Sequence, residues 1–276
     1  MKLILGVANL VNSYGLNRSF LNKNNFLKII KSKYVSGIDT ALSYTKPNKV
    51  LKKTNLKKKL ITTKLPKIDY RNDNIEKIIF RKFESHLKNL NLKKVNSLLL
   101  HNTQIMFSKN GRSIYKALKN LKKKYGIKKI GFSVYDLKEA NFLIKKYNPE
   151  ILQVPINLFN NNFENLIRNN KKIFFQARSI FLQGQLLNPS RRLLKNKNIK
   201  KLLYKFNKEC NDLNISKSKA CIDYIRLHKN IDQMIFSVKN FEEFEIIKKA
   251  FKEKIVFKKK FRVDKNTSAL LDPRKW

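Results

Sequence analysis

Cysteines and long apolar runs are scarce in this chain. Only two of its 276 residues are cysteines, Cys210 and Cys221, and they form no C-x-x-C pair. Such a pair of residues supports neither a disulfide framework nor a zinc knuckle, so we expect no bound metal. No uncharged apolar stretch reaches the roughly 20 residues that a membrane-spanning helix needs. These absences predict a cytoplasmic protein that makes no contact with a membrane.

Glycines and flexible linkers are also scarce. The chain has seven glycines, at positions 6, 15, 37, 111, 126, 131 and 184. Their spacing allows neither the G-x-G-x-x-G turn of a dinucleotide-binding open sheet nor a Walker A loop. No Pro/Gly/Ser-rich segment interrupts the sequence, so we expect a single domain over residues 1–276. If the chain binds a dinucleotide, it does so without a glycine-rich motif of either kind.

Acidic residues are few, because 19 Asp and Glu stand against 62 Lys and Arg, which gives a formal net charge of +43. Such a charge is typical of proteins that bind nucleic acid. However, lysine far outnumbers arginine, which base-reading proteins prefer, and the lysines are spread from Lys2 to Lys275. Asparagine and isoleucine are abundant as well, as codon bias in an AT-rich genome produces. We expect no specific nucleic-acid partner, and polyanion binding remains the alternative.

What the sequence does contain is a regular alternation of short apolar runs and longer amphipathic stretches. The amphipathic stretches carry apolar residues three or four positions apart, which is typical of helices. Apolar runs that alternate with helices predict a parallel sheet, and their near-continuous apolarity favours a closed barrel over a doubly wound open sheet. We therefore predict the α/β class and a parallel eight-stranded (β/α)8 TIM barrel. The predicted strands are residues 3–8, 37–40, 60–64, 95–101, 129–134, 151–155, 173–177 and 233–238, and the clearest helices are residues 74–90, 112–124, 137–147 and 241–251.

Four side chains suited to acid–base chemistry follow three neighbouring predicted strands. They are Asp39 and Tyr44 at and after the end of the second strand, Lys64 at the end of the third and His101 at the end of the fourth. In a β/α barrel, the C-terminal ends of the strands meet at the active-site face. Each residue alone has an ordinary structural interpretation, such as a turn former or a core histidine. Their convergence on adjacent strand ends predicts one shared cleft.

These four groups fit the reduction of a carbonyl by hydride transfer, which leaves negative charge on oxygen and needs a proton donor. The pKa of a free tyrosine is about 10, too high for easy proton exchange near neutrality. A buried Lys64 ammonium would lower the pKa of Tyr44, and Asp39 would keep that ammonium charged and oriented. His101 would hydrogen-bond the carbonyl oxygen. The set predicts Tyr44 as the proton donor.

The same segments resemble the aldo/keto reductase family over nearly the whole chain. Residues 37–44, G-I-D-T-A-L-S-Y, are similar to the family's G-[IV]-D-T-A-x-x-Y signature around its Asp and Tyr. Similar segments carry the family's Lys, its His, and its K-[IV]-G-[IVF]-S and Q-x-x-[YF]-N motifs: residues 61–64, 98–102, 129–134 and 152–157. The resemblance implies an NADPH-dependent oxidoreductase that reduces an aldehyde or ketone to an alcohol, with the catalytic residues Asp39, Tyr44, Lys64 and His101.

The resemblance also implies which residues bind NADPH. Ser133 and Gln153 would hold the nicotinamide carboxamide, and Lys239 would pair with the 2′-phosphate, which favours NADPH over NADH. The loop after the seventh strand would cradle the pyrophosphate, and the segment after the eighth strand would hold the adenosine end. The full implied set is Ser133, Gln153, Arg178, Ser179, Phe181, Gln183, Lys239, Asn240 and Glu243.

The cofactor segments depart from the family pattern at several positions. Arg178 stands where a tyrosine usually stacks on the nicotinamide ring, and Val134 stands where an asparagine usually binds the carboxamide. Ser237 replaces a common glycine, and Glu243 replaces a glutamine or arginine near the adenine. These departures keep open an alternative, a sensory or weakly active family member that binds NADPH but turns over poorly.

The loop at residues 177–184, A-R-S-I-F-L-Q-G, is most similar to a bacterial branch of the family associated with sugar or surface-polysaccharide pathways. This similarity implies a small-molecule carbonyl substrate, for which a sugar-derived compound is a candidate. Asn9, Tyr14, the loop after His101 and the tail ending at Trp276 would shape its pocket. The resemblance further implies a monomer.

Overall fold

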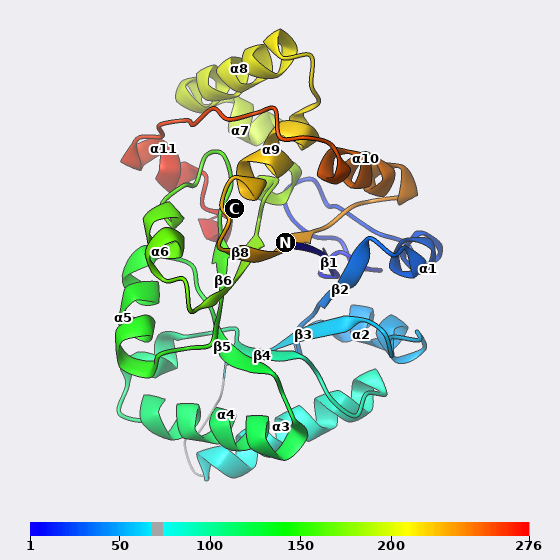
Figure 1. Cartoon of the computed structure of the whole chain (residues 1–276), viewed down its shortest axis with the longest axis vertical. Helices are drawn as coiled ribbons and strands as arrows, with labels where there is room; N and C mark the ends of the chain where they lie inside the picture. The colour runs from blue at the N-terminus through cyan, green and yellow to red at the C-terminus, as the bar shows by residue number, and fades with distance from the viewer. Residues whose placement is uncertain (68–73, 276) are drawn as a thin grey trace.

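Eight strands form one closed barrel, in which neighbouring strands are parallel and the strand order follows the sequence. The structure is a computed structural model that describes residues 1–67 and 74–275. Figure 1 shows the helices outside the ring of strands. The predicted parallel (β/α)8 barrel is therefore confirmed. The strands are β1 (Lys2–Gly6), β2 (Val35–Asp39), β3 (Leu60–Leu65), β4 (Ser97–Leu100), β5 (Lys129–Ser133), β6 (Ile151–Pro155), β7 (Phe174–Arg178) and β8 (Ile231–Phe236).

The strands are buried along almost their whole length, because one face meets the barrel interior and the other meets the surrounding helices. This double burial explains why they appear in the sequence as near-continuous apolar runs. All eight predicted runs are strands, and their ends lie at most two residues from the predicted positions. His101 follows β4 directly, and its backbone N–H donates to the carbonyl of Leu65 in β3 at 2.9 Å.

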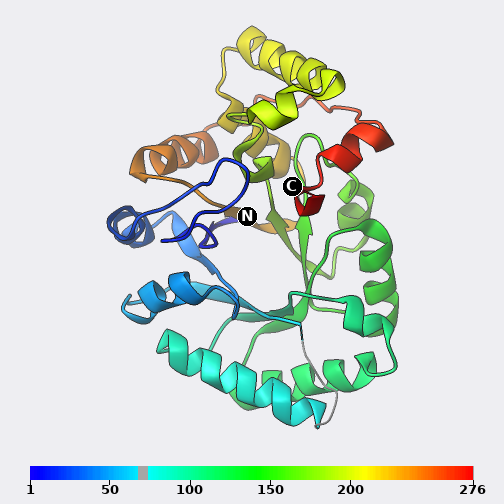
Figure 2. The same cartoon turned by 180° about the vertical axis from the view of Figure 1, so that it is seen from behind.

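Several helices begin at polar residues that accept a hydrogen bond from the first turn, such as Asn74, Asp136 and Asn240. The four helices predicted most clearly are confirmed as α3, α4, α5 and α10. The segment between β7 and β8 contains α7 and α8 in addition to α9, and Figure 2 shows α7 and α8 at one end of the molecule. The helices are α1 (Lys23–Lys31), α2 (Thr45–Lys52), α3 (Ile75–Leu90), α4 (Gly111–Tyr125), α5 (Leu137–Tyr147), α6 (Glu164–Asn169), α7 (Arg191–Leu194), α8 (Lys197–Asp212), α9 (Lys217–Arg226), α10 (Phe241–Lys252) and α11 (Lys265–Leu270), with 3-10 turns η1 (Gln104–Phe107), η2 (Leu182–Gly184) and η3 (Pro273–Lys275).

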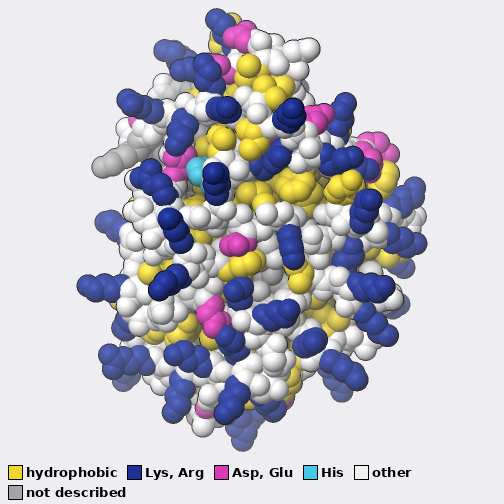
Figure 3. Space-filling model, in the orientation of Figure 1, with side chains coloured by type: hydrophobic (Ala, Val, Ile, Leu, Met, Phe, Trp, Pro, Cys, Tyr) yellow, Lys and Arg dark blue, Asp and Glu magenta, His cyan; other side chains and the backbone are white. Residues whose placement is uncertain are grey.

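The basic side chains cover the molecular surface broadly. On the face shown in Figure 3, Lys and Arg side chains are scattered from one end to the other and are not gathered into a single stripe. This dispersion agrees with the explanation of the charge by composition. Within residues 1–67 and 74–275, no helix combines the length and the apolarity that crossing a membrane requires.

The contact between β5 and β6 at Gly131 gives a test of the barrel packing. A Cβ at position 131 would lie 1.8 Å from the carbonyl oxygen of Ile151, so the two strands would have to move apart. We expect Gly131→Ala to lower the free energy of unfolding by about 3 kcal/mol or more, the upper range for overpacking. Chemical denaturation measures this loss.

Gly126 supplies the matched control. It ends α4 with a φ of +62°, and nothing lies within 4 Å of a Cβ built there. Gly126→Ala therefore carries only the conformational cost of a left-handed residue, about 1 kcal/mol. Equal losses for the two variants would contradict the close approach at Gly131.

Candidate active site

A cleft of about 1210 Å³, partly open to solvent, lies at the C-terminal ends of the strands. Asp39, Tyr44, Lys64 and His101 all line it, although they come from β2, the start of α2, β3 and the end of β4. The structure thus brings the four predicted catalytic side chains to one place. Most of the predicted cofactor residues line the same cleft: Ser133, Gln153, Arg178, Ser179, Phe181, Gln183, Lys239 and Glu243.

A buried ion pair between Lys64 and Asp39 forms the base of the cleft. The Lys64 Nζ donates to Asp39 Oδ2 at 2.5 Å and to the carbonyl of Thr40 at 3.1 Å. The two side chains are only 2% and 9% exposed. The second carboxylate oxygen, Asp39 Oδ1, accepts from Gln153 Nε2 at 2.8 Å. Both oxygens of Asp39 are therefore hydrogen-bonded, as a buried charge requires.

A chain of glutamine amides continues this network across the barrel interior. Gln153 Nε2 also donates to Gln176 Oε1 at 3.0 Å, and Gln176 Nε2 donates to Gln233 Oε1 at 2.6 Å and to Thr62 Oγ1 at 2.9 Å. All of these side chains are buried, so each polar atom needs such a partner. The sequence patterns do not single out Gln176 and Gln233. The one signal is an amide in the middle of an otherwise apolar strand.

Tyr44 is positioned by a turn between β2 and α2. It immediately precedes α2, and its backbone N–H donates to the carbonyl of Ala41 at 3.1 Å. Asn48 in α2 reaches back to this turn, since its side chain accepts from Thr40 Oγ1 at 2.8 Å and donates to the Ala41 carbonyl at 2.9 Å. The ring of Tyr44 meets the ring of His101 edge to face, with centroids 6.3 Å apart. The phenol and the imidazole therefore share one wall of the cleft.

The loop that follows His101 is tied to the loop after β5. The hydroxyl of Thr103 donates to the carboxylate of Glu139, and the backbone N–H of Tyr135 donates to the other oxygen of that carboxylate at 2.7 Å. Glu139 belongs to α5 and is 6% exposed. Through it, α5 fixes the loops after the neighbouring strands β4 and β5, which carry His101 and Tyr135.

The electrostatic environment of Tyr44 differs from the sequence-based expectation. Burial raises the pKa of Tyr44 above its ordinary value, the Asp39 carboxylate raises it further, and Arg178 acts in the opposite direction. The pKa of Tyr44 is therefore raised, not lowered as the sequence predicted. The phenol stays protonated at neutral pH, as a proton donor must.

His101 is neutral at the same pH. Burial, reinforced by the positive charges of Lys64 and Arg178, lowers the pKa of His101 to about 4. A neutral imidazole carries one N–H donor, which can hydrogen-bond an oxygen placed between it and Tyr44. Burial also lowers the pKa of Lys64, and the Asp39 carboxylate opposes this effect. The cleft thus combines a phenol, a neutral imidazole and a compensated ion pair.

The proposed carboxamide site lies beside this network. Ser133 Oγ donates to Gln153 Oε1 at 3.3 Å, so the two predicted residues are in contact. Both hydrogens of Gln153 Nε2 are already engaged by Asp39 and Gln176. Gln153 therefore supports the ion pair, and Ser133 together with Gln153 Oε1 offers the polar groups that face the cleft.

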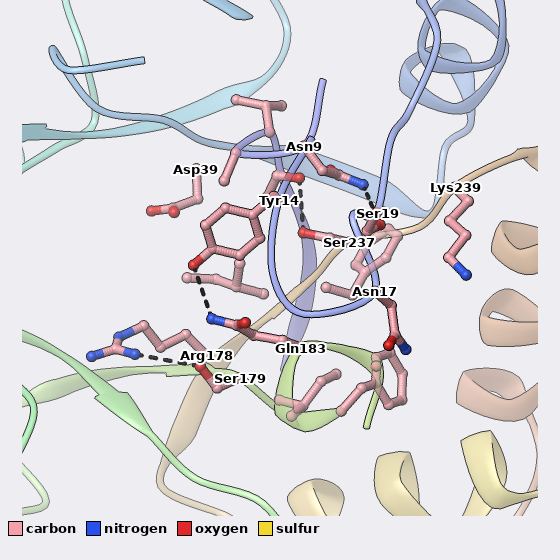
Figure 4. A pocket seen from close by; sticks show the side chains of 18 of the residues that line it. Asn9, Tyr14, Asn17, Ser19, Asp39, Arg178, Ser179, Gln183, Ser237 and Lys239 are labelled. Atoms are coloured by element: carbon pink, nitrogen blue, oxygen red, sulfur yellow. Dashed lines mark hydrogen bonds between the residues drawn. The ribbon is translucent and has the colours of Figure 1, made fainter. Parts of the chain in front are cut away.

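Two loops face each other across the rest of the cleft. The first is a short hairpin in which Tyr14 and Ser19 exchange backbone hydrogen bonds of 3.0 and 2.8 Å. The second is the loop after β7, where Gln183 lies opposite Tyr14 and its Nε2 donates to the Tyr14 hydroxyl at 3.4 Å (Figure 4). Asn17 Nδ2 also bridges the loops by donating to the carbonyl of Asn188 at 2.7 Å. The cleft passes between them.

Asn9 reaches the cleft from the loop after β1. Its Nδ2 donates to Ser19 Oγ at 3.0 Å and to the carbonyl of Val238 at 2.9 Å (Figure 4). Asn9 is 1% exposed, and its Oδ1 has no hydrogen-bond partner among the described residues. The predicted role of Tyr14 and Asn9 as pocket residues agrees with their place in the lining. Trp276 lies outside the described residues.

The far end of the cleft is formed by the start of α10. The exposed Lys239 and the carboxylate of Glu243 line it, and the backbone N–H of Lys239 donates to Glu243 Oε2 at 2.8 Å. Asn240 has another role, because its Oδ1 accepts from the Glu243 backbone N–H at 2.9 Å and caps the helix. Asn240 is not part of the described cleft wall. No cluster of three or more His, Cys, Asp or Glu side chains that could hold a metal occurs in the described part of the chain.

Comparisons with known proteins point in one direction. The profile of the aldo/keto reductase family matches residues 2–265. Among solved structures, an aldo-keto reductase from Bacillus halodurans in holo form superposes with a TM-score of 0.74 at 12% identity, covering 92% of this chain and 88% of that one. A thermostable aldo-keto reductase solved with the inhibitor epalrestat gives a TM-score of 0.68 at 18% identity and coverage of 98% and 93%. A third, from a Medee basin deep-sea metagenome library, gives 0.63 at 19% identity and coverage of 98% and 89%. A comparison with curated proteins found no match.

The buried ion pair gives a stability test. We expect Lys64→Met to lower the free energy of unfolding by about 3–5 kcal/mol, because it leaves the Asp39 carboxylate buried without its counter-ion. The double variant Asp39→Asn, Lys64→Met should lose less than Lys64→Met alone, since no buried charge remains. Chemical denaturation at pH 7 measures the unmodified protein, the single variants Asp39→Asn and Lys64→Met, and the double variant.

The exposed pair between Lys124 and Glu84 is the matched control for this test. Its side chains are 55% and 45% exposed, so water already screens the two charges. Lys124→Met should therefore change the free energy of unfolding by less than about 1 kcal/mol. A double variant at Asp39 and Lys64 that loses the sum of its two single losses would show that the charges are not coupled.

Proposed function

The chain belongs to the aldo/keto reductase family, and on that premise we propose that it uses NADPH to reduce an aldehyde or ketone to an alcohol, with Tyr44 as the proton donor. The family comprises oxidoreductases that act on small carbonyl compounds. One observation carries the proposal for this chain. Tyr44, His101 and the Lys64–Asp39 ion pair share one cleft, although they come from separate segments.

The cleft contains polar groups that fit a dinucleotide. The unpartnered Oδ1 of the buried Asn9 is an acceptor that suits a hydroxyl, and Ser133 with Gln153 Oε1 suits a carboxamide. Gly184 has a φ of +87° and open space around it, so the backbone of the β7 loop can approach a pyrophosphate closely. Ser179, Phe181 and other residues of that loop complete the wall. A fold neighbour has been solved in holo form.

The residues of the chain would divide the work around the carbonyl oxygen. When bound, NADPH supplies the hydride that goes to the carbonyl carbon. The neutral His101 donates a hydrogen bond that orients the carbonyl oxygen, and Tyr44 transfers its phenolic proton to that oxygen as negative charge develops there. Lys64 then stabilises the resulting phenolate electrostatically, while Asp39 keeps the ammonium charged and in place. The carbonyl compound gains one hydride and one proton and becomes the alcohol, and Tyr44 regains its proton from solvent.

Lys239 supports the choice of NADPH over NADH. It is an exposed cation at the end of the cleft opposite the ion pair, where its ammonium can meet a 2′-phosphate. Glu243 lies at the same end, and its carboxylate is held by the backbone N–H of Lys239.

The single domain, the monomeric state and the cytoplasmic location stay predictions from the sequence.

Replacing Tyr44 tests the proposed chemistry. We expect Tyr44→Phe to abolish most NADPH oxidation with a panel of short aldehydes, a loss of about 100-fold or more, because general acid catalysis contributes about 10²–10⁴-fold. The affinity for NADPH, measured by fluorescence quenching, should stay nearly unchanged, since the hydroxyl acts on the substrate. A parallel loss of NADPH binding would make Tyr44 a structural residue. NADPH binding by the unmodified protein without turnover would favour the sensory alternative.

Replacing Lys239 tests the cofactor choice. We expect Lys239→Ala to raise the dissociation constant of NADPH about tenfold more than that of NADH, because a charge-assisted hydrogen bond to the 2′-phosphate is lost. Lys249 is the control, because it lies on α10, the helix that follows Lys239, but outside the cleft. Lys249→Ala should leave the NADPH to NADH ratio unchanged. Equal losses for both nucleotides in Lys239→Ala would contradict the 2′-phosphate assignment.

A further inference from the structure

Arg178, the last residue of β7, is a cation without a carboxylate partner in the described part of the chain. Its Nη2 donates to the carbonyl of Val134 at 2.8 Å, and its Nη1 lies 3.4 Å from Ser179 Oγ (Figure 4). The guanidinium carbon lies 4.3 Å from the ring centroid of Tyr135. These contacts are all with uncharged groups. They hold the guanidinium in place but leave its charge uncompensated.

This charge acts on the catalytic end of the cleft. Arg178 lowers the pKa of His101, of Lys64 and of Tyr44, so its field reaches all three side chains. The charge of Lys64 is already compensated by Asp39 at 2.5 Å. Arg178 therefore leaves this part of the cleft with one excess positive charge. A half-buried cation of this kind gains most from an anion that enters the same space.

A second guanidinium near Arg178 already has its partner. Arg274 lies 4.9 Å from the centroid of the same Tyr135 ring, but it forms an ion pair with Asp272 at 2.6 Å. Figures 1 and 2 both show α11, which precedes Arg274, near α6 on one side of the barrel. Tyr135, Arg178 and Ser179 line the catalytic cleft and also a second cavity beneath this C-terminal segment. Arg178 thus stands where a substrate can extend away from the reacting carbonyl.

The bound cofactor cannot compensate Arg178 at the nicotinamide, because the reduced ring is neutral and the oxidised ring is positive. We infer, as an extension of the proposed function, that the carbonyl substrate is an oxo acid whose carboxylate is bound by Arg178. A guanidinium offers a planar set of N–H donors that matches a carboxylate, so it supplies both charge and orientation. Arg178 is then the residue that selects acidic substrates over neutral ones.

Two aldehydes of the same shape and different charge test this inference. 4-Formylbenzoate carries a carboxylate, and 4-formylbenzamide carries an uncharged amide in its place. We expect the chain to show a kcat/KM at least about tenfold higher for the acid, the effect of one hydrogen-bonded charge pair. In Arg178→Gln this ratio should fall to near one, and Arg178→Lys should keep part of it. The ratio cancels any common loss from folding or cofactor binding.

Arg274→Gln is the matched control, since Arg274 lies over the same ring but is compensated by Asp272. It should keep the acid-to-amide ratio within about threefold of the original, as expected for a charge that is already paired. Equal kcat/KM values for the two aldehydes in the unmodified chain would overturn the inference and leave the proposed function standing. If Arg178→Gln keeps the acid-to-amide ratio but binds NADPH more weakly, the anion that Arg178 binds is a group of the cofactor. That outcome would also overturn the inference.

A binding measurement separates this inference from the proposed function. If the chain reduces neither these two aldehydes nor the panel of short aldehydes, the proposed function fails, and calorimetry with 4-formylbenzoate and 4-formylbenzamide still decides the role of Arg178. Tighter binding of 4-formylbenzoate than of the amide, lost in Arg178→Gln, would support the carboxylate site. Equal binding of the two compounds would refute it.

Discussion

The ion pair between Lys64 and Asp39 is the constraint on which the site depends. Removing two charges from water costs several kcal/mol each, and their attraction offsets this only when every remaining polar atom is satisfied. The carboxylate meets this condition through Lys64 on one oxygen and Gln153 on the other. The amides of Gln176 and Gln233 extend the same condition to β7 and β8. The interior of the barrel is therefore partly polar because the ion pair requires it.

The chemistry of the cleft follows from how the charges are compensated. Because both side chains are buried, Tyr44 remains a protonated phenol and His101 a neutral imidazole, which are the forms needed to donate to an oxygen. The excess charge comes from Arg178, which only uncharged groups contact. The net charge of +43 plays a different part. It is carried mainly by side chains scattered over the surface, where salt screens them within about 10 Å.

The barrel could be predicted from the sequence because double burial makes each strand a continuous apolar run. The meeting of Asp39, Lys64 and His101 in one cleft could be predicted because parallel strands bring them to one face, whatever the helices between them do. The pKa of Tyr44 could not be predicted, since it depends on how far water is excluded and on the charges that lie around the phenol, such as the Asp39 carboxylate. Contacts between side chains that are distant in the sequence could not be predicted either. Nothing in the spacing of residues 135, 178 and 274 indicates that two guanidinium groups lie over one ring.

The burial of Lys64 also determines how the protein would respond to chemical labelling. Amine-directed reagents need a neutral, solvent-accessible amine, and Lys64 is 2% exposed with its Nζ held by a carboxylate and a carbonyl. The many exposed lysines around the barrel would react first. Covalent attachment to a surface through lysines would therefore leave the amine at the base of the cleft unmodified. A chain this rich in lysine thus keeps the ammonium of its buried ion pair out of reach of acylating compounds.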